Sequence, residues 1–206
     1  MSQSVFARKR SRGTLRPTVV GLAVVTAAII GAVGYQSASS AHSLDEALGD
    51  DRDATSTEAD GALPQGVTVF DDEYAGVAKL DPDLLHALRQ AATAAADDGI
   101  HVYVNSGWRS PKYQNQLLRE AVSKYGSEED AARWVATADT SAHVSGDAVD
   151  IGSSDATAWL SEHGAEYGLC QIYGNEPWHY ELHPEAIDRG CPAMYADPRH
   201  DPRMQR

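Results

Sequence analysis

The stretch that decides the fold and the site covers residues 141–150 and reads Ser-Ala-His-Val-Ser-Gly-Asp-Ala-Val-Asp. A distant stretch, residues 176–179, reads Glu-Pro-Trp-His and adds a second imidazole and another carboxylate. Gly146 lets the chain fold back, so the side chains of His143 and Asp150 can converge. Two imidazoles and one carboxylate, with a fourth position open to water, form a ligand set suited to a catalytic Zn²⁺ ion. The remaining carboxylate can then serve as the base that deprotonates this water.

Capping residues and helical spacing predict four helices around these stretches. Asp81-Pro82 is typical of a helix start, and apolar residues follow it at helical spacing until Gly99. The other helix starts are predicted at Ser110-Pro111, at Ser127 with Asp130 as a capping box leading through residues 134–135, and at Ser154. Short strands are predicted at residues 100–104, 148–151, 170–173 and 178–182. Helices and strands that mix without regular alternation favour an α+β fold with an antiparallel sheet.

Charge is distributed unevenly along the 206 residues. Residues 1–41 contain five basic and no acidic side chains, so the rest of the chain carries 12 basic and 30 acidic ones, a net charge of −18. Binding of nucleic acid needs clusters of Lys and Arg, so this balance argues against a nucleic-acid partner. An acidic domain also gains no long-range attraction to an anionic polymer, and such a substrate must be held by local contacts.

The composition of residues 1–41 is typical of an export segment. Residues 19–35 are almost wholly apolar behind a basic start, and the small residues 39–41 fit a cleavage site for a signal peptide. An uncleaved apolar segment of this length is also near the minimum for a membrane anchor. Cleaved signal peptide and retained signal anchor are therefore both open, and either one exports the rest of the chain.

The remaining boundaries follow from composition. Residues 42–66 are acidic without an apolar period, which predicts a disordered linker. The folded domain is expected over residues 67–192, followed by a loose polar tail at 193–206. The two cysteines, Cys170 and Cys191, fall inside this domain and are expected to pair in an exported chain. Their disulfide would stabilise the domain by roughly 3 kcal/mol.

Three blocks of residues occur in a fixed order along the chain. They are Ser106-Gly107-Trp108-Arg109-Ser110 with Gln114, then Ser141-x-His143-x-x-Gly146-x-Ala148-x-Asp150, then Glu176-x-Trp178-His179. Together they resemble the VanY-type zinc D-alanyl-D-alanine carboxypeptidases and their D,D-dipeptidase relatives, over roughly residues 67–182. The resemblance implies a compact α+β domain of the type shared with the hedgehog amino-terminal domain, in which helices flank a small central antiparallel sheet.

The resemblance also implies a set of metal-binding and catalytic residues. It implies that one Zn²⁺ ion is held by His143, Asp150 and His179, and that Glu176 is the catalytic base. Glu181 is a rival base on residue pattern alone, because strand alternation places it on the same face as His179.

Three further residues are implied in substrate binding. Arg109 would bind and polarise the substrate, with Gln114 and Ser141 nearby in the substrate site. Arg109 directly precedes a predicted helix, where the helix dipole disfavours a cation. An anionic substrate group between Arg109 and that helix would remove this conflict.

The implied function is that of an exported zinc metallopeptidase. It would remove the C-terminal D-alanine from D-Ala-D-Ala-ending peptidoglycan stem peptides or precursors in the bacterial cell envelope, either membrane-anchored or secreted. The alternatives are an L,D-carboxypeptidase or a D,D-dipeptidase on the same fold, or a non-catalytic, zinc-stabilised domain that binds the cell wall. The expected partners are the stem peptide and, if the apolar segment is uncleaved, the membrane. We expect a monomer.

Overall fold

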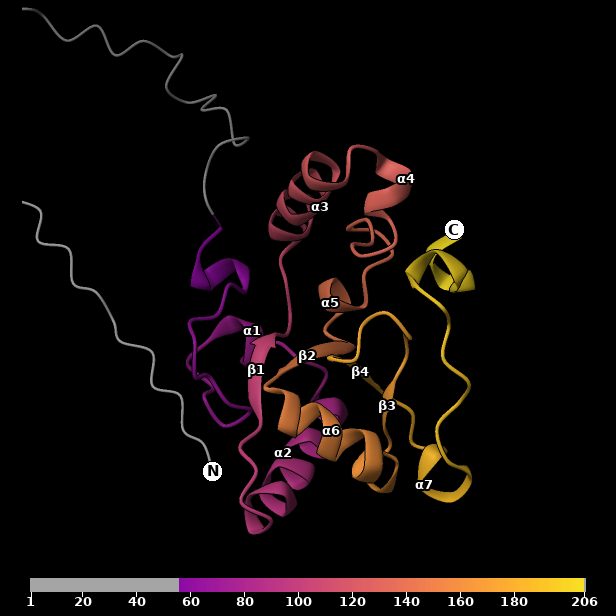
Figure 1. Cartoon of the computed structure of the whole chain (residues 1–206). Helices are drawn as coiled ribbons and strands as arrows, with labels where there is room; N and C mark the ends of the chain where they lie inside the picture. Colours follow the sequence, from indigo (N-terminus) through magenta and orange to yellow (C-terminus); the bar gives the residue numbers. More distant parts are fainter. Residues whose placement is uncertain (1–55, 206) are drawn as a thin grey trace, which may run out of the picture. The chain divides into compact units, whose positions relative to one another are not determined.

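The structure is a computed structural model that describes residues 56–205 (Figure 1). The predicted export segment, residues 1–41, and residues 42–55 of the predicted linker lie outside the described residues. Within residues 56–205, no helix combines the length and the apolar character needed to cross a membrane.

Four antiparallel strands form one sheet, with the strand order β1-β2-β4-β3. Their bounds are Tyr103–Ser106 for β1, Ala148–Gly152 for β2, Leu169–Gln171 for β3 and His179–Leu182 for β4. The α+β fold with a small antiparallel sheet is thereby confirmed. Strand β1 begins later than the predicted residue 100, because the preceding residues close a helix. The N–H of Ile100 donates to the carbonyl of Ala95 at 2.8 Å, across Gly99 with a φ of 78°.

One face of the sheet carries the main hydrophobic core. Helices α2 (Pro82–Asp97) and α6 (Ser154–His163) cover this face and lie close together in Figure 1. The start of α2 is fixed as predicted, since the Asp81 side chain accepts hydrogen bonds from the N–H groups of Asp83 and Leu84. The core side chains from the sheet and α2 are buried and include Val149, Ile151, Tyr180, Leu84, Leu88, Ala91 and Ala95.

The other face of the sheet receives the polar residues of the two central strands. Because side chains alternate along a strand, Asp150 leaves β2 on this face, and His179 and Glu181 leave β4. Three helices lie on this side in Figure 1. They are α3 (Pro111–Tyr125), α4 (Glu128–Ala131) and α5 (Ala142–Ser145).

The third predicted helix is shorter than its pattern indicated. It is α4, capped by Ser127 as expected, but it ends at Ala131. The N–H groups of Arg133 and Trp134 donate to carbonyls only three residues back, those of Asp130 and Ala131, so the α-helical pattern gives way to a turn. The remaining short helical elements are α1 (Ala75–Ala78), α7 (Ala186–Arg189) and the 3-10 helices η2 (Glu58–Asp60), η3 (Gly164–Tyr167), η4 (Pro198–His200) and η5 (Pro202–Gln205).

The ordered contacts extend beyond both predicted ends of the domain. Before residue 67, the hydroxyl of Ser110 donates to Asp60 at 3.0 Å. After residue 192, the expected loose tail instead forms η4 and η5, and Asp201 in this tail is 0% exposed. The prediction of a loose tail is wrong because polar side chains of the tail have partners elsewhere in the domain. Asp201, for example, accepts a hydrogen bond from the hydroxyl of Tyr173 at 3.0 Å.

A second, smaller hydrophobic cluster explains where the tail packs. It consists of Cys170, Ile172, Tyr173 and Ala186, with Met204 of the tail against it. Cys170 and Cys191 form the predicted disulfide. This bond joins β3 to the segment after α7 and so fixes the start of the tail beside the sheet.

Candidate metal centre and catalytic pocket

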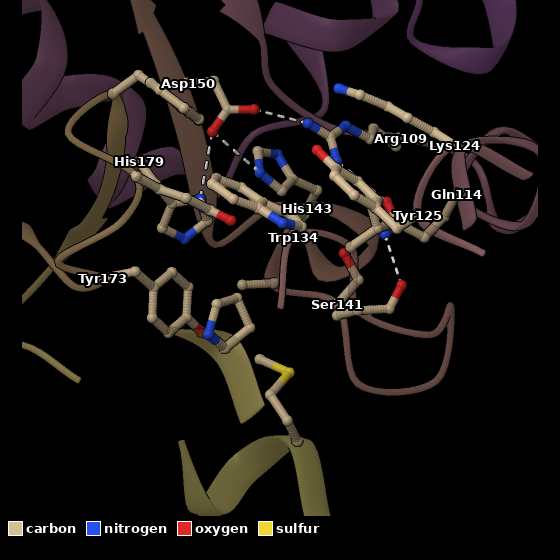
Figure 2. A pocket seen from close by; sticks show the side chains of 17 residues that line it. Arg109, Gln114, Lys124, Tyr125, Trp134, Ser141, His143, Asp150, Tyr173 and His179 are labelled. Carbon is tan, nitrogen blue, oxygen red and sulfur yellow. Dashed lines mark hydrogen bonds and ion pairs between the residues drawn. The ribbon is translucent and has the colours of Figure 1, made fainter. Parts of the chain in front are cut away.

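Three side chains from separate parts of the sequence converge on the polar face of the sheet. Asp150 of β2 and His179 of β4 are direct partners in the strand register, and His143 comes from α5. One ligand atom from each lies within 4.8 Å of the other two. Asp150 Oδ1 is 3.4 Å from His143 Nε2 and 3.2 Å from His179 Nδ1 (Figure 2). The structure therefore brings together the three residues that the sequence pattern nominated as metal ligands.

A glycine turn makes this convergence possible. Gly146 ends α5 with a φ of 88°, and a Cβ at this position would lie 2.6 Å from the carbonyl oxygen of Lys79. The Gly146 carbonyl also accepts a hydrogen bond from the N–H of Asp81 at 2.9 Å. Only glycine fits both the backbone angle and the close approach. The turn thus fixes α5 against the start of α2 and directs His143 toward Asp150.

Hydrogen bonds orient both imidazoles. His143 Nδ1 lies 2.8 Å from the carbonyl oxygen of Gly107, which can only accept, so Nδ1 carries the proton and Nε2 faces Asp150. His179 Nε2 lies 3.2 Å from Glu181 Oε1, and a carboxylate likewise only accepts. His179 therefore presents Nδ1 to Asp150. In both rings the nitrogen that faces Asp150 is the one left available as a metal ligand.

The electrostatics of the cluster favour a cation among these atoms. Burial, helped by the charge of Arg109, lowers the pKa of His143. Burial alone would raise the pKa of Asp150, but His143, His179 and Arg109 hold it well below its ordinary value. Burial also opposes charge on His179, yet hydrogen bonds to Asp150 and Glu181 raise its pKa to about 9. A proton on His179 supplies positive charge there, and a divalent cation held by the same atoms would replace that proton.

Glu176 lies beside this cluster with one oxygen unpaired. Its Oε2 is 3.9 Å from His179 Nδ1, and its buried Oε1 has no hydrogen-bond partner within residues 56–205. The turn that carries it is closed by a hydrogen bond from the N–H of His179 to the Glu176 carbonyl, at 3.1 Å. Burial raises the pKa of Glu176 to about 7. A carboxyl group with this pKa can both accept and release a proton near neutral pH.

Glu181, the rival base, has a different environment. It shares the sheet face with His179 as expected, but its carboxylate contacts Nε2, on the ring edge away from Asp150. Both of its oxygens also accept hydrogen bonds from Arg203, at 2.6 and 3.1 Å. These contacts are those of a carboxylate that orients a ligand, and they leave Glu176 as the better-placed base.

Arg109 reaches into the cluster from the segment before α3. Its Nη2 is 2.6 Å from Asp150 Oδ2, its Nε donates to Ser106 at 2.7 Å, and its Nη1 donates to Gln114 at 3.2 Å. The sequence suggested that an anionic substrate group would balance the charge of Arg109. In the structure, the carboxylate of Asp150 supplies a negative charge beside it. Five N–H groups belong to a guanidinium, so two remain available to a ligand.

Gln114 and Ser141 differ in how free they are to contact a ligand. Gln114 is buried in α3 and accepts from Arg109 while donating to the carbonyl of Ala136 at 2.8 Å, so it braces Arg109. Ser141 lies at the start of α5, and its hydroxyl makes no hydrogen bond within the described residues. Both side chains line the pocket, as Figure 2 shows.

One cavity of about 470 Å³ is lined by the three converging ligand residues and by Glu176, Arg109, Gln114 and Ser141. Residues that the motifs did not indicate form much of its wall. Tyr125 and Trp134 stack at 5.9 Å between ring centroids, at an interplanar angle of 11°. Trp178, which belongs to the third sequence block, is 38% exposed and also lines the cavity. Further lining residues are Lys124, Tyr173, Pro198 and Met204. No sequence signal identified these four, because they reach the cavity only through tertiary packing of α3, the segment after β3 and the tail.

Known proteins are similar to this chain in sequence and in fold. A family model described as "VanY: D-alanyl-D-alanine carboxypeptidase" matches residues 77–185. A D-alanyl-D-alanine carboxypeptidase of Enterococcus faecalis is 29% identical over 127 residues, which cover 50% of this chain and 47% of that protein. The chain therefore spans about half the length of this curated relative.

Two solved structures have a similar fold. The structure of VanYB in complex with D-Alanine-D-Alanine is 26% identical, with a TM-score of 0.50 over 54% of this chain and 78% of the other. The structure of the LdcB LD-carboxypeptidase is 22% identical, with a TM-score of 0.50 over 64% of this chain and 71% of the other. The second likeness concerns the fold alone.

Proposed function

The chain belongs to the VanY family of D-alanyl-D-alanine carboxypeptidases, and we propose that it removes the C-terminal D-alanine from peptidoglycan stem peptides or their precursors. The observation that carries the proposal is the unpaired, buried Glu176 Oε1 beside three converging ligand atoms. A structural metal site would not need a buried carboxylate with a free oxygen at its edge, since structural sites are closed by their ligands.

The proposed metal ligands are His143 through Nε2, Asp150 through a carboxylate oxygen and His179 through Nδ1. The donor set fits Zn²⁺, because two imidazoles and one carboxylate leave a coordination position for water or substrate. A bound Zn²⁺ ion would supply Lewis acidity and lower the pKa of water near it. The hydrogen bonds to Gly107 and Glu181 keep the two imidazoles oriented for this role.

Glu176 is the proposed base. Its Oε1 takes a proton from the attacking water as the water oxygen bonds to the scissile carbonyl carbon. The same carboxyl then gives the proton to the nitrogen of the departing D-alanine as the C–N bond breaks. A pKa of about 7 suits both transfers, because the group is then neither too strong an acid to accept nor too weak to donate.

Arg109 is the proposed group that stabilises negative charge on the substrate oxygen. Its guanidinium is held by Ser106, Gln114 and Asp150, so its free N–H groups are fixed in direction before substrate arrives. Preorganised donors of this kind stabilise the tetrahedral oxyanion more than the planar carbonyl. The free hydroxyl of Ser141, in the same cavity, is a proposed contact for the substrate.

The disulfide and the family both favour a place outside the cytoplasm. We propose the bacterial cell envelope, with residues 1–41 as a signal peptide or membrane anchor and residues 42–55 as a tether. The acidic charge balance still argues against nucleic acid as a partner. The solved structure of VanYB is in complex with D-Ala-D-Ala, and this supports the same peptide end as the proposed substrate of this chain.

Product analysis tests the proposal. The full chain is incubated with a stem pentapeptide ending in D-Ala-D-Ala and, separately, with the tetrapeptide ending in a single D-alanine, each with zinc and with a chelator. The expected product is one free D-alanine, released only with zinc. Release of the intact dipeptide would indicate a D,D-dipeptidase, and release only from a tetrapeptide ending in a single D-alanine would indicate an L,D-carboxypeptidase. Bound zinc without cleavage of any stem peptide would contradict enzymatic function and favour a wall-binding domain.

A further inference from the structure

The C-terminal tail supplies a charged side chain to the metal centre from beyond the region that matches the family. The match ends at residue 185, and Arg203 lies in η5. Arg203 Nη1 donates to Glu181 Oε2 at 2.6 Å, and Nη2 donates to Glu181 Oε1 at 3.1 Å. This is a two-pronged pair, in which the planar fork of the guanidinium matches both carboxylate oxygens.

Asp201 fixes Arg203 from the other side. The Nε of Arg203 donates to Asp201 Oδ1 at 3.1 Å and to Oδ2 at 2.9 Å. Asp201 is fully buried and also accepts the hydroxyl of Tyr173 at 3.0 Å. A pair of surface side chains usually contributes little, but here two buried carboxylates share one guanidinium, which restricts its position strongly.

The far end of this chain of contacts is a proposed metal ligand. Glu181 Oε1 is 3.2 Å from His179 Nε2, so the carboxylate held by Arg203 is the one that orients the imidazole. The ring of Tyr173, whose hydroxyl is bound to Asp201, also packs on the His179 ring with 5.0 Å between centroids. The tail therefore holds one edge of the His179 ring through Glu181 and one face of that ring through Tyr173.

We propose that Arg203 is a positioning residue of the metal centre, which holds Glu181 in place and through it fixes the tautomer and direction of His179. The inference rests on the proposed function only in taking His179 as a metal ligand. Loss of a partner that orients a metal-bound imidazole typically lowers metal affinity by 10- to 100-fold. Without Arg203, Glu181 would be a buried carboxylate whose sole remaining partner within residues 56–205 is His179, and the carboxylate would move toward solvent.

The test measures zinc affinity of the full chain by competition with a chelator, without substrate. Arg203→Met is expected to weaken zinc binding by about 10- to 100-fold. Arg203→Lys keeps the charge but not the two-pronged geometry, and is expected to recover part of that loss. The matched control is Arg199→Met in the same tail, where the guanidinium contacts Asp197 and Glu129 and not Glu181. Its zinc affinity is expected to stay within twofold of the native value.

A double-mutant cycle separates positioning from simple docking of the tail. If Arg203 acts through Glu181, Arg203→Met combined with Glu181→Gln weakens zinc binding by less than the product of the two single effects. Multiplicative effects, an unchanged affinity in folded Arg203→Met, or an equal loss in Arg199→Met would each overturn the proposal. Because no substrate is present, weakened zinc binding in a chain that cleaves no stem peptide would leave this inference intact and overturn only the proposed function.

Discussion

Arg109 and Asp150 are joined by an ion pair with 2.6 Å between Nη2 and Oδ2, while the other oxygen of the same carboxylate faces both imidazoles. The proposed substrate-binding cation is thus fixed by a proposed metal ligand. Because a buried charge pair loses stability when one partner is removed, a change at either residue is expected to affect both metal binding and substrate binding.

Substitution of Arg109 tests this coupling. In Arg109→Lys the fork that contacts Ser106, Gln114 and Asp150 is replaced by a single ammonium group, which cannot make all three contacts. We expect kcat/KM for D-alanine release to fall by about 10²- to 10³-fold, the size of effect seen when one oxyanion donor is lost. Arg119→Lys, on the exposed side of α3, is the control. A kcat/KM within twofold of the native value would show that Arg109 does not contact the reacting oxygen.

Glu176→Gln separates metal binding from proton transfer. The amide has nearly the same shape as the carboxyl group but cannot take a proton from water. We expect kcat to fall by about 10²- to 10⁴-fold, the typical contribution of a general base, while the zinc content stays at one ion per chain. Both quantities are measured on the same preparation, by D-alanine release and by elemental analysis. Native activity in this variant would refute the role assigned to Glu176.

The disulfide is expected to stabilise the domain chiefly by restricting the unfolded chain. Cys170 and Cys191 are 21 residues apart, and closing a loop of this size contributes roughly 3 kcal/mol on the chain-entropy model. The double variant Cys170→Ala, Cys191→Ala should therefore lose roughly 3 kcal/mol of unfolding free energy in urea titrations. Adding reductant should lower the stability of the native protein and leave the double variant unchanged. Equal stability of the two proteins without reductant would contradict this account.

The stability of the tail should depend on pH through Asp201. Burial alone would raise its pKa, but hydrogen bonds from Arg203 and Tyr173 hold the pKa below its ordinary value. A carboxyl group whose pKa is lower in the folded state stabilises that state fully above the unfolded pKa of about 3.9, and loses this effect as pH falls through the folded value. The unfolding free energies of the native protein and Asp201→Asn should thus differ most near pH 7 and approach each other below about pH 4. A difference that is constant across this range would rule out the linkage.

Local sequence patterns were sufficient for the central elements of the site. The alternation in residues 178–182 placed His179 and Glu181 on one face, and the glycine at 146 allowed the chain to return toward Asp150, as the structure has it. Capping residues also located the starts of α2, α3 and α6 within a residue. These features depend on neighbours in the sequence, which is why the sequence alone reveals them.

Features that depend on distant partners were not predictable in the same way. The tail is polar, so its burial became visible only with its partners, Tyr173 and Glu181, in place. The strand pattern alone likewise left Glu181 as a rival to Glu176, because it does not specify the direction of the His179 ring. The stacked wall of Tyr125 and Trp134 joins the end of α3 to the loop after α4, and no local spacing encodes that contact.

Anomalous diffraction at the zinc edge, from crystals of the zinc-loaded full chain, tests the central claim most directly. The account predicts one strong peak at about 2.0–2.2 Å from His143 Nε2, His179 Nδ1 and an oxygen of Asp150. It also predicts that the Glu176 carboxylate lies beside the ion without binding it. A peak elsewhere in the molecule, or a zinc ion that lacks any one of these three ligands, would contradict the account.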